Sequence, residues 1–425
     1  MKHTSPVNWK VRKLDQLGFV GRGRSQHRPR NEPSLYGGEY PFFQTGDIKA
    51  ANLYLSEHSQ TYNEKGLAQS KLWEPGTLCI TIAANIADTA ILAIPGCFPD
   101  SVIGFIADPS EADVRFIKYY IDLIKLDMQQ VSHGTTQDNL SLDKLLRFDF
   151  VAPDVEEQQK IAAVLSAYDD LIENNLRRIK ILEEMAQNLY REWFVKFRFP
   201  GHQRARFIDS PLGRIPEGWE VRGAMENNHW SFIHQNIGAY EGVKRYYATA
   251  DIDGITITSN GIEYTYSQKP IRAQKQPLIN SVWFARMQET YKMIAVAKPN
   301  AFLAANCMHS SGFAGFKAHD EDSFAFLFLT IKSKEFHLEK DRYCTGATQR
   351  SLTNDGLSRI LTISPPRDIV QNFGRLAMRH VELILVLQQR NKILRRTRDL
   401  LLPKLISGEV DVSELDITVP EEVAT

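Results

Sequence analysis

The 425-residue chain has few cysteines, no long hydrophobic segment and no excess of charge of either sign. Its cysteines lie far apart and form no Cys-x-x-Cys pair, so neither a disulfide framework nor a zinc knuckle is indicated. The opening residues hold no apolar core of a signal peptide, and the most apolar run, residues 78 to 94, is interrupted by Asn85 and Asp88. We therefore expect a soluble cytoplasmic protein that does not enter a membrane. The cysteines expected to be buried thiols are Cys79, Cys97, Cys307 and Cys344.

Motifs of nucleotide-binding, methyl-transferring and metal-dependent enzymes are also missing. Neither Gly-x-x-x-x-Gly-Lys-Ser/Thr nor Gly-x-Gly-x-x-Gly occurs, and no two histidines have the spacing His-x-x-x-His. Ser364-Pro365-Pro366-Arg367 lacks the aromatic residue of an adenine methyltransferase loop, and Asp47-Ile48-Lys49 is not preceded by the Pro-Asp of a metal-dependent nuclease. We expect no catalytic residue, no metal site and no cofactor in this chain. Residues 364 to 367 and Ala152-Pro153-Asp154 are interpreted as turns between a strand and a helix.

Length and charge distribution indicate several domains with segregated charges. A single hydrophobic core rarely grows past about 250 to 300 residues, so two or three domains are expected. Lysine plus arginine and aspartate plus glutamate each number 51, and a net charge of zero argues against a stand-alone DNA-binding domain. Residues 409 to 422 form an acidic tail. The basic residues gather in two short clusters, Arg22, Arg24, Arg28 and Arg30 in one, and Arg390, Lys392, Arg395, Arg396 and Arg398 in the other.

An internal repeat is the most informative feature of the sequence. Gly134-Thr135-Thr136-Gln137 matches Gly346-Ala347-Thr348-Gln349 at an offset of 212, and the same offset holds without a gap for more than fifty residues. The middles of the two halves barely match, so the pattern indicates one scaffold with two specificities; an old duplication with drift is the alternative. At the offset of 212, Leu140, Leu145, Pro153, Lys180 and Leu189 recur as Leu352, Leu357, Pro365, Lys392 and Leu401. At an offset of 210, Pro6, Trp9, Val11 and Arg12 recur as Pro216, Trp219, Val221 and Arg222.

Each half ends in a long predicted helix. Residues 156 to about 198 contain no glycine or proline, and apolar residues alternate by four and three, the spacing of a coiled-coil seam. The same seam recurs in the second half at the repeat offset, although Pro403 should end or kink the last turn there. A buried core helix is the alternative to a coiled coil. The predicted seam residues are Ile161, Leu165, Ile172, Asn175, Ile179, Leu182, Leu189, Ile384, Leu387, Asn391, Leu394 and Leu401.

The two helices are expected to pair with each other in the antiparallel sense, which would relate the halves by a pseudo-twofold axis. If Ile161 faces Leu405, facing positions add up to 566, and Asn175 then meets Asn391. A buried asparagine pair fixes the register of a coiled coil, because slippage would leave each amide against hydrocarbon. Two exposed edge residues are the alternative.

The remaining segments, residues 10 to 150 and 222 to 360, contain short β-rich runs broken by turns, together with helical stretches such as residues 114 to 125. This predicts an α+β domain with a mixed or antiparallel sheet in each half. Clustered arginine and glutamine side chains on loops are candidates for DNA contacts, although each taken singly is equally well a solvated surface residue. The candidates are Arg22, Arg24, Arg28, Arg30, Gln44, Thr45 and Lys49 in the first half and Lys244, Arg245, Arg286, Gln288 and Lys292 in the second.

The repeated Gly-x-Thr-Gln segment adds a candidate site in each half. A glycine followed by hydroxyl and amide groups suits a tight loop that presents hydrogen-bond donors to a phosphate. A turn that caps the next element is the alternative. The residues concerned are Thr136, Gln137, Thr348, Gln349 and Arg350.

Taken together, these motifs resemble the specificity subunits of type I restriction-modification systems. The resemblance is carried by Ile-Pro-Glu-Gly-Trp-Glu at 215 to 220, Gly-Thr-Thr-Gln at 134 to 137, Glu-Gln-Gln-Lys-Ile at 157 to 161 and Leu-Leu-Pro-Lys-Leu-Ile-Ser-Gly at 401 to 408. It covers essentially the whole chain. The second helix departs from the pattern, because Asp368 to Gln371 replaces the Glu-Gln of the first.

The resemblance implies a non-catalytic subunit that reads a bipartite site in double-stranded DNA. It implies target-recognition domains at residues 1–155 and 201–365, helical spacers at 156–200 and 366–408, and the acidic tail at 409–425. It further implies partners: two methyltransferase subunits, which bind S-adenosylmethionine, and restriction subunits that translocate and cut DNA. The alternatives are a stand-alone DNA-modifying enzyme with an unrecognised site and a coiled-coil scaffold that binds protein alone.

Overall fold

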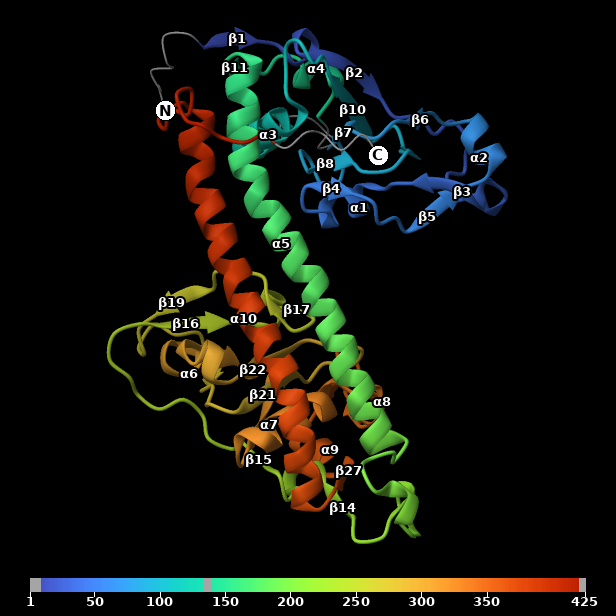
Figure 1. Ribbon diagram of the computed structural model, residues 1–425, viewed down its shortest axis with the longest axis vertical. Helices are drawn as coiled ribbons and strands as arrows, with labels where there is room; N and C mark the ends of the chain where they lie inside the picture. Colours follow the sequence, from blue (N-terminus) through green and yellow to red (C-terminus); the bar gives the residue numbers. More distant parts are fainter. Residues whose placement is uncertain (1–8, 133–139, 420–425) are drawn as a thin grey trace. The chain divides into compact units, whose positions relative to one another are not determined.

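The structure is a computed structural model that describes residues 9–132 and 140–419 (Figure 1). The chain divides into two compact units, unit 1 with Met1–Asn174 and Lys392–Thr425, and unit 2 with Asn175–Asn391. The boundary crosses both long helices, α5 (Val155–Tyr190) and α10 (Arg367–Ile406). Each unit therefore contains one α+β domain and one segment of each long helix.

Unit 1 is built on two mixed sheets and a terminal ribbon. The five-stranded sheet has the order β2 (Gly18–Arg22), β10 (Val102–Ala107), β7 (Leu78–Thr81), β8 (Thr89–Leu92) and β4 (Tyr54–Leu55). The four-stranded sheet has the order β5 (Gln60–Tyr62), β3 (Tyr36–Phe42), β9 (Gly96–Cys97) and β6 (Leu72–Trp73). The ribbon pairs β1 (Lys10–Arg12) with β11 (Phe150–Ala152). The helices are α1 (Thr45–Ala50), α2 (Glu64–Ala68), α3 (Val114–Ser132) and α4 (Leu142–Leu145).

Unit 2 repeats this plan with different residues. Its first sheet has the order β15 (Trp230–Phe232), β24 (Phe313–Ala318), β21 (Ser281–Ala285) and β22 (Met293–Val296). Its second sheet has the order β19 (Ile262–Tyr264), β16 (Lys244–Tyr247), β23 (Cys307–Ser310) and β20 (Ala273–Lys275). The two-stranded pairs are β12 (Phe207–Ser210) with β13 (Gly213–Pro216), β14 (Glu220–Gly223) with β27 (Leu361–Ser364), β17 (Ile252–Asp253) with β18 (Thr256–Ile257) and β25 (Cys344–Thr345) with β26 (Ser351–Leu352). The helices are α6 (Phe302–Asn306), α7 (Glu321–Lys332), α8 (Lys334–Arg342) and α9 (Asn354–Ser358).

The second sheets of the two units have the same strand pairing, although their sequences barely match. In unit 1, β3 pairs antiparallel with β5 and parallel with β9, and β9 pairs antiparallel with β6. In unit 2, β16 pairs antiparallel with β19 and parallel with β23, and β23 pairs antiparallel with β20. The middles of the two halves therefore share a topology that their amino acids do not reveal.

The ends of the halves correspond residue by residue. Val11 faces Val151 in the β1–β11 ribbon, and Val221 faces Ile363 in the β14–β27 ribbon, as the offsets of 210 and 212 require. The hydroxyl of Ser141 caps α4, and that of Thr353, its counterpart in the repeat, caps α9. The strand-to-helix turns predicted at 152–154 and 364–367 are confirmed, because β11 leads into α5 and β27 into α10.

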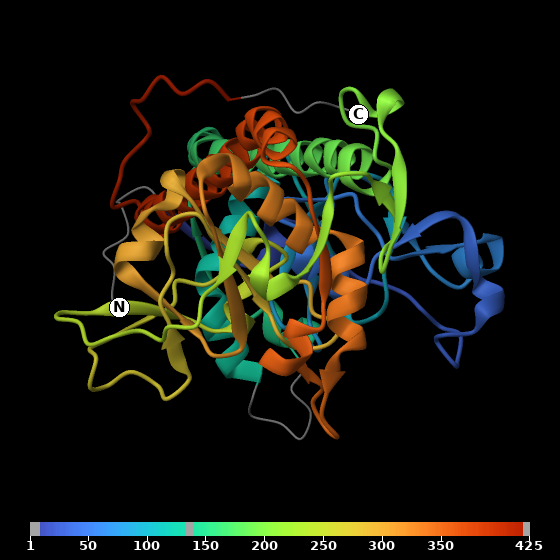
Figure 2. The ribbon, with the colours of Figure 1, turned by 90° about the horizontal axis from the view of Figure 1, so that it is seen from below.

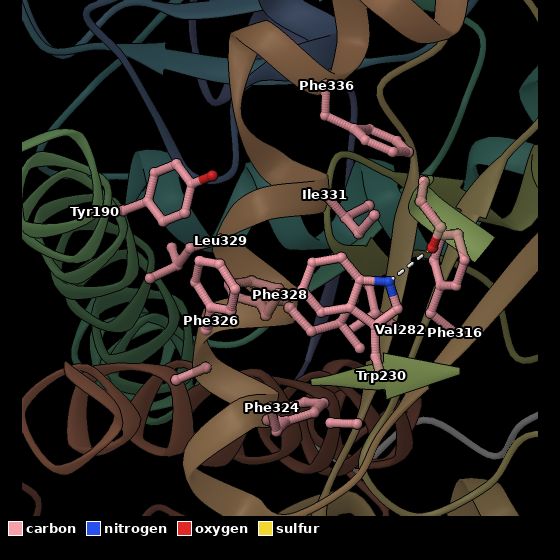
Figure 3. Close-up of a cluster of buried hydrophobic side chains, with 14 of the residues drawn as sticks. Tyr190, Trp230, Val282, Phe316, Phe324, Phe326, Phe328, Leu329, Ile331 and Phe336 are labelled. Atoms are coloured by element: carbon pink, nitrogen blue, oxygen red, sulfur yellow. Dashed lines mark hydrogen bonds between the residues drawn. The ribbon is translucent and has the colours of Figure 1, made fainter. Parts of the chain in front are cut away.

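Apolar helices cover one face of each domain. In unit 2, α7 packs against β21 and β24, and the orange helices lie beside the strands in Figure 2. Every residue of α7 from Ser323 to Ile331 is buried, as expected of a helix that is apolar on all sides. Figure 3 shows its phenylalanines packed around Trp230, whose indole N–H donates to the carbonyl of Ala224 at 2.9 Å. In unit 1, α3 has the same role and contributes Phe116, Ile117 and Ile121 to a core that includes Ile161 and Leu165 of α5.

Segments of α5 and α10 run antiparallel within each unit (Figure 1). In unit 1, Ile161 and Leu165 share a core with Leu405. In unit 2, Ile179 packs with Ile384 and Leu387, and the rings of Trp193 and Phe373 lie 5.6 Å apart. The structure buries or half-buries all of the predicted seam residues, including Ile172, Leu182, Leu189, Leu394 and Leu401. The predicted α+β class, with mixed or antiparallel sheets in two domains and an antiparallel helix pair, is confirmed, as are the buried, free cysteines.

The C-terminal ends of both long helices differ from the sequence prediction. The prediction extended the first helix to about residue 198, whereas the α-helix ends at Tyr190 and continues as a π-helical turn over Arg191–Val195. This wider turn allows the consecutive Trp193 and Phe194 both to be buried. α10 continues through Pro403 to Ile406. Beyond it Val412 is buried in the unit 1 core, so the first part of the acidic tail packs against the domain.

Candidate nucleic-acid interface

The arginine cluster of the first half converges on Asp100, which follows β9. Arg28 and Arg30 form ion pairs with its carboxylate, and the Nε of Arg22 donates to its backbone carbonyl. Both paired arginine side chains remain about half exposed. Arg24 donates to Gln26 at 2.9 Å and is exposed. The structure therefore brings Arg22, Arg28 and Arg30 together at Asp100, where a single carboxylate leaves a net positive charge.

The other candidates of the first half lie at helix α1. Gln44 precedes it and donates through its amide to Gln60 at 2.7 Å, and Thr45 is its first residue. Lys49 is exposed and its ammonium donates to Oδ1 of Asn85 at 3.2 Å. Asn85 lies in the loop between β7 and β8, which the sequence interpretation had not selected. The sequence around Asn85 gave little indication of a DNA contact, because this loop interrupts an apolar run and contains no basic residue.

Three candidates of the second half have partners within their own domain. Arg245 forms an ion pair with Glu263 at 2.6 Å, and this hydrogen bond raises the pKa of the guanidinium. Lys244 donates to the carbonyl of Ala305 at 2.6 Å, and burial lowers its pKa. Lys292 donates to the carbonyl of Thr249 at 3.1 Å. Their assignment to DNA stays a prediction.

The remaining candidates of the second half come together at the β25–β26 hairpin. Its loop, residues 346 to 350, holds Thr348, Gln349 and Arg350, and all five residues are exposed. Arg286 lies beneath it and donates to the carbonyl of Leu352 at 2.9 Å, and burial lowers the pKa of its guanidinium. The backbone N–H of Gln288 donates to the carbonyl of Arg350 at 3.0 Å. Arg286 thus anchors the hairpin, and the exposed loop is the part available to a ligand.

The matching loop of the first half, with Thr136 and Gln137, lies outside the described residues. The residue that follows it is informative, because the N–H of Leu140 donates to the carbonyl of Ile82 just after β7. The N–H of Leu352 donates to the carbonyl of Arg286 just after β21 in the same way. Leu140 and Leu352, which follow the two Gly-x-Thr-Gln segments, are therefore bonded at equivalent places just after β7 and β21.

The described residues form neither a metal-binding cluster nor a helix that could cross a membrane. Within residues 9–132 and 140–419, no group of three or more His, Cys, Asp or Glu side chains could hold a metal ion. Over the same residues, the helices are all too short or too polar to cross a membrane.

Comparison with known proteins shows what the chain is similar to. Residues 6–184 match the family model described as type I restriction modification DNA specificity domain. The type I restriction enzyme MjaIX specificity subunit of Methanocaldococcus jannaschii is 28% identical over 424 residues, which cover 96% of this chain and 95% of the relative. The HindI specificity subunit of Haemophilus influenzae is 21% identical over 339 residues, covering 66% of this chain and 72% of the relative.

A solved structure supports the fold. The type I restriction-modification S subunit from M. genitalium superimposes with a TM-score of 0.58 at 15% identity, over 95% of this chain and 98% of that one. Residues 6–184 thus match a type I restriction modification DNA specificity domain, and almost the whole chain is similar in sequence to a type I restriction enzyme specificity subunit.

Proposed function

We propose that this chain reads a bipartite DNA sequence, one half-site for each α+β domain, on behalf of a type I restriction-modification complex. One observation carries the proposal: the two domains share a topology and equivalent ribbons and caps, but differ in the residues of their loops. A common scaffold fixes how each domain meets the duplex, whereas different loop side chains select different bases.

The helix pair would set the distance between the half-sites and provide the surface on which two methyltransferase subunits dock. Those subunits would supply S-adenosylmethionine and the methyl-transfer chemistry, and restriction subunits would join them to cut DNA. The chain itself would be non-catalytic. The similarity to type I restriction enzyme specificity subunits supports this division of labour, and partners that close around the duplex would account for a net charge of zero.

A domain exchange tests the proposal. Residues 10 to 150 are replaced by the corresponding region of a relative that directs methylation to another site, and methylation is mapped in cells that express the chimera with the methyltransferase subunits. We expect one half-site to change while the other half-site and the spacing stay the same. The reciprocal exchange of residues 222 to 360 is the matched control and should change the other half-site.

Two results would contradict the proposal. A change in both half-sites after one exchange would refute the modular reading of DNA. Methyl transfer or cleavage by the purified chain alone would instead identify a stand-alone enzyme, the alternative that the sequence left open. Binding should also weaken steeply with salt, because phosphate contacts release counterions.

A further inference from the structure

We propose that the β7–β8 loop, residues 82 to 88, and the β21–β22 loop, residues 286 to 292, are the preorganised base-reading loops of the two domains. The proposal rests on the function proposed above and assigns a reading residue to each half-site, Asn85 in the first and Gln288 in the second. The loops are equivalent by topology, since each joins two antiparallel strands of the first sheet of its domain.

The second loop is held from below by helix α8. Lys340 is fully buried, and its ammonium donates to the carbonyls of Met287 and Thr290 at 2.8 Å each. The neighbouring Asp341 accepts from the backbone N–H of Glu289 at 3.0 Å and lies 3.1 Å from the Lys340 ammonium. A buried charge is costly unless it is paired, so this arrangement fixes the loop backbone at three points.

The first loop is held by α3, which at the offset of 212 corresponds to the second part of α7 together with α8. The side-chain amide of Gln129 donates to the carbonyl of Ile86 at 3.0 Å, and Lys125 forms an ion pair with Asp88. Gln129 and Asp341 are counterparts at the repeat offset found in the sequence. The same helix position therefore holds the equivalent loop backbone in both domains. Gln129 does so as a hydrogen-bond donor and Asp341 as an acceptor.

Both loops contain non-glycine residues in the left-handed region of the backbone map. Ala84 and Ala87 have φ values of 63° and 60°, and Glu289 has a φ of 55°. Such conformations are unfavourable for residues with a Cβ atom and persist where the surroundings enforce them. A loop fixed in advance loses little conformational entropy on binding, which is what precise recognition requires.

The tips of the loops carry the chemistry of base recognition. Within the described part of the chain the Gln288 side-chain amide has no hydrogen-bond partner, and Met287 and Tyr291 beside it are 40% and 57% exposed. An amide pairs in two places with adenine, and an apolar group contacts the methyl of thymine. Asn85 offers the same amide in the first domain, and Lys49 holds its oxygen at 3.2 Å. The exposed 346–350 loop, bonded to Gln288 through Arg350, would hold the adjacent phosphate.

The test compares Gln288→Ala with Asn85→Ala in the full chain, assembled with its methyltransferase subunits. Preferred sites are selected from a library of random DNA duplexes and sequenced. Gln288→Ala should reduce discrimination at one base position of one half-site by about 10- to 100-fold, and Asn85→Ala should do so in the other half-site. Each variant is the matched control for the other, because the unaltered half-site should keep its preference.

A second pair of variants tests the positioning role of the helices. Asp341→Ala and Gln129→Ala each remove one bond to a loop backbone and should broaden the preference of the half-site read by that loop. Asp341→Asn keeps an oxygen for the Glu289 N–H and should restore the preference. A change in melting temperature without broader base preference would show a structural role alone and would overturn the positioning role.

The outcomes separate this inference from the proposed function. If the wild-type complex selects a bipartite site and both alanine variants select the same site, the loop assignment is wrong and the proposed function stands. An equal loss on all sequences would likewise overturn it, because it would mean phosphate contact. If the wild-type complex selects no site, the proposed function itself fails.

Discussion

Asn175 of α5 donates a hydrogen bond of 2.8 Å from Nδ2 to Oδ1 of Asn391 of α10, and both side chains are buried. The pair was predicted from the sequence alone by placing Ile161 opposite Leu405, and its register is confirmed. Within the described residues, Nδ2 of Asn391 has no hydrogen-bond partner. This unpaired amide group lowers the stability of the folded protein, whereas the asparagine pair specifies one register of the two helices.

We predict that Asn175→Leu alone lowers the free energy of unfolding by about 1 to 3 kcal/mol, because it leaves the Asn391 amide buried without its partner. Asn175→Leu combined with Asn391→Leu should recover that stability or exceed it. Urea unfolding of both variants and of Asn391→Leu gives the coupling energy. Strictly additive effects of the two substitutions would show that the pair does not act as a unit.

A second prediction concerns the buried network of Tyr119, Asp169 and Arg398, which involves the unit 1 segments of α5 and α10. Asp169 is 1% exposed, accepts a 2.5 Å hydrogen bond from the Tyr119 hydroxyl and forms an ion pair with Arg398. Arg398→Met should destabilise the protein by about 3 kcal/mol, because it leaves a buried carboxylate without its cation. Lys404→Met on the same helix, which breaks an exposed ion pair with Glu409 just beyond the helix end, is the control and should have a much smaller effect. Equal effects in thermal unfolding would contradict this assignment.

The stability of unit 2 should fall in mild acid. His309 is fully buried beside Trp283, and burial lowers its pKa from 6.5 to about 3. Between these two values the unfolded chain binds a proton that the folded chain does not, so stability is full above about pH 6.5 and is lost as the pH falls. From pH 6.5 to 4.5 the loss from this group is about 2 to 3 kcal/mol.

The pH prediction is checked with His309→Leu. The variant should lose less stability than the wild type between pH 6.5 and 4.5, measured by denaturant unfolding at both pH values. His58→Leu is a control, since that histidine is exposed in the other unit. Parallel stability profiles for wild type and His309→Leu would show that another group causes the acid sensitivity.

The 346–350 hairpin and its anchor should respond differently to substitution. Gln349 is exposed, so Gln349→Ala should leave the melting temperature unchanged and weaken binding to specific and unrelated DNA about equally, if it holds a phosphate. Arg286 donates to Leu352 and Asn354, so Arg286→Met should lower the melting temperature as well as DNA binding. Salt-dependent binding and thermal unfolding, measured on both variants, separate the two roles. A base-specific loss from Gln349→Ala would instead make it a reader.

Sequence self-similarity predicted more of this structure than composition did. The repeat correctly implied equivalent strand-to-helix turns at 152–154 and 364–367, and the structure adds equivalent helix caps at Ser141 and Thr353. Side-chain periodicity along one helix depends on nearby residues alone, which is why the seam and the Asn175–Asn391 register could be inferred. The π-helical turn was missed, because it arises from the burial of both Trp193 and Phe194.

The sequence by itself determined the repeat, the α+β class, the two long helices and their antiparallel alignment, because local spacing and repetition encode all of these. Only the tertiary structure decided which loops are held in place and which arginines face inward. Lys340 fixes the backbone of Met287 from 53 residues away, and Arg398 meets Asp169 across 229 residues. Such contacts depend on how strands and helices pack. The residues near Asn85 and Gln288 do not by themselves predict which helix supports their loops.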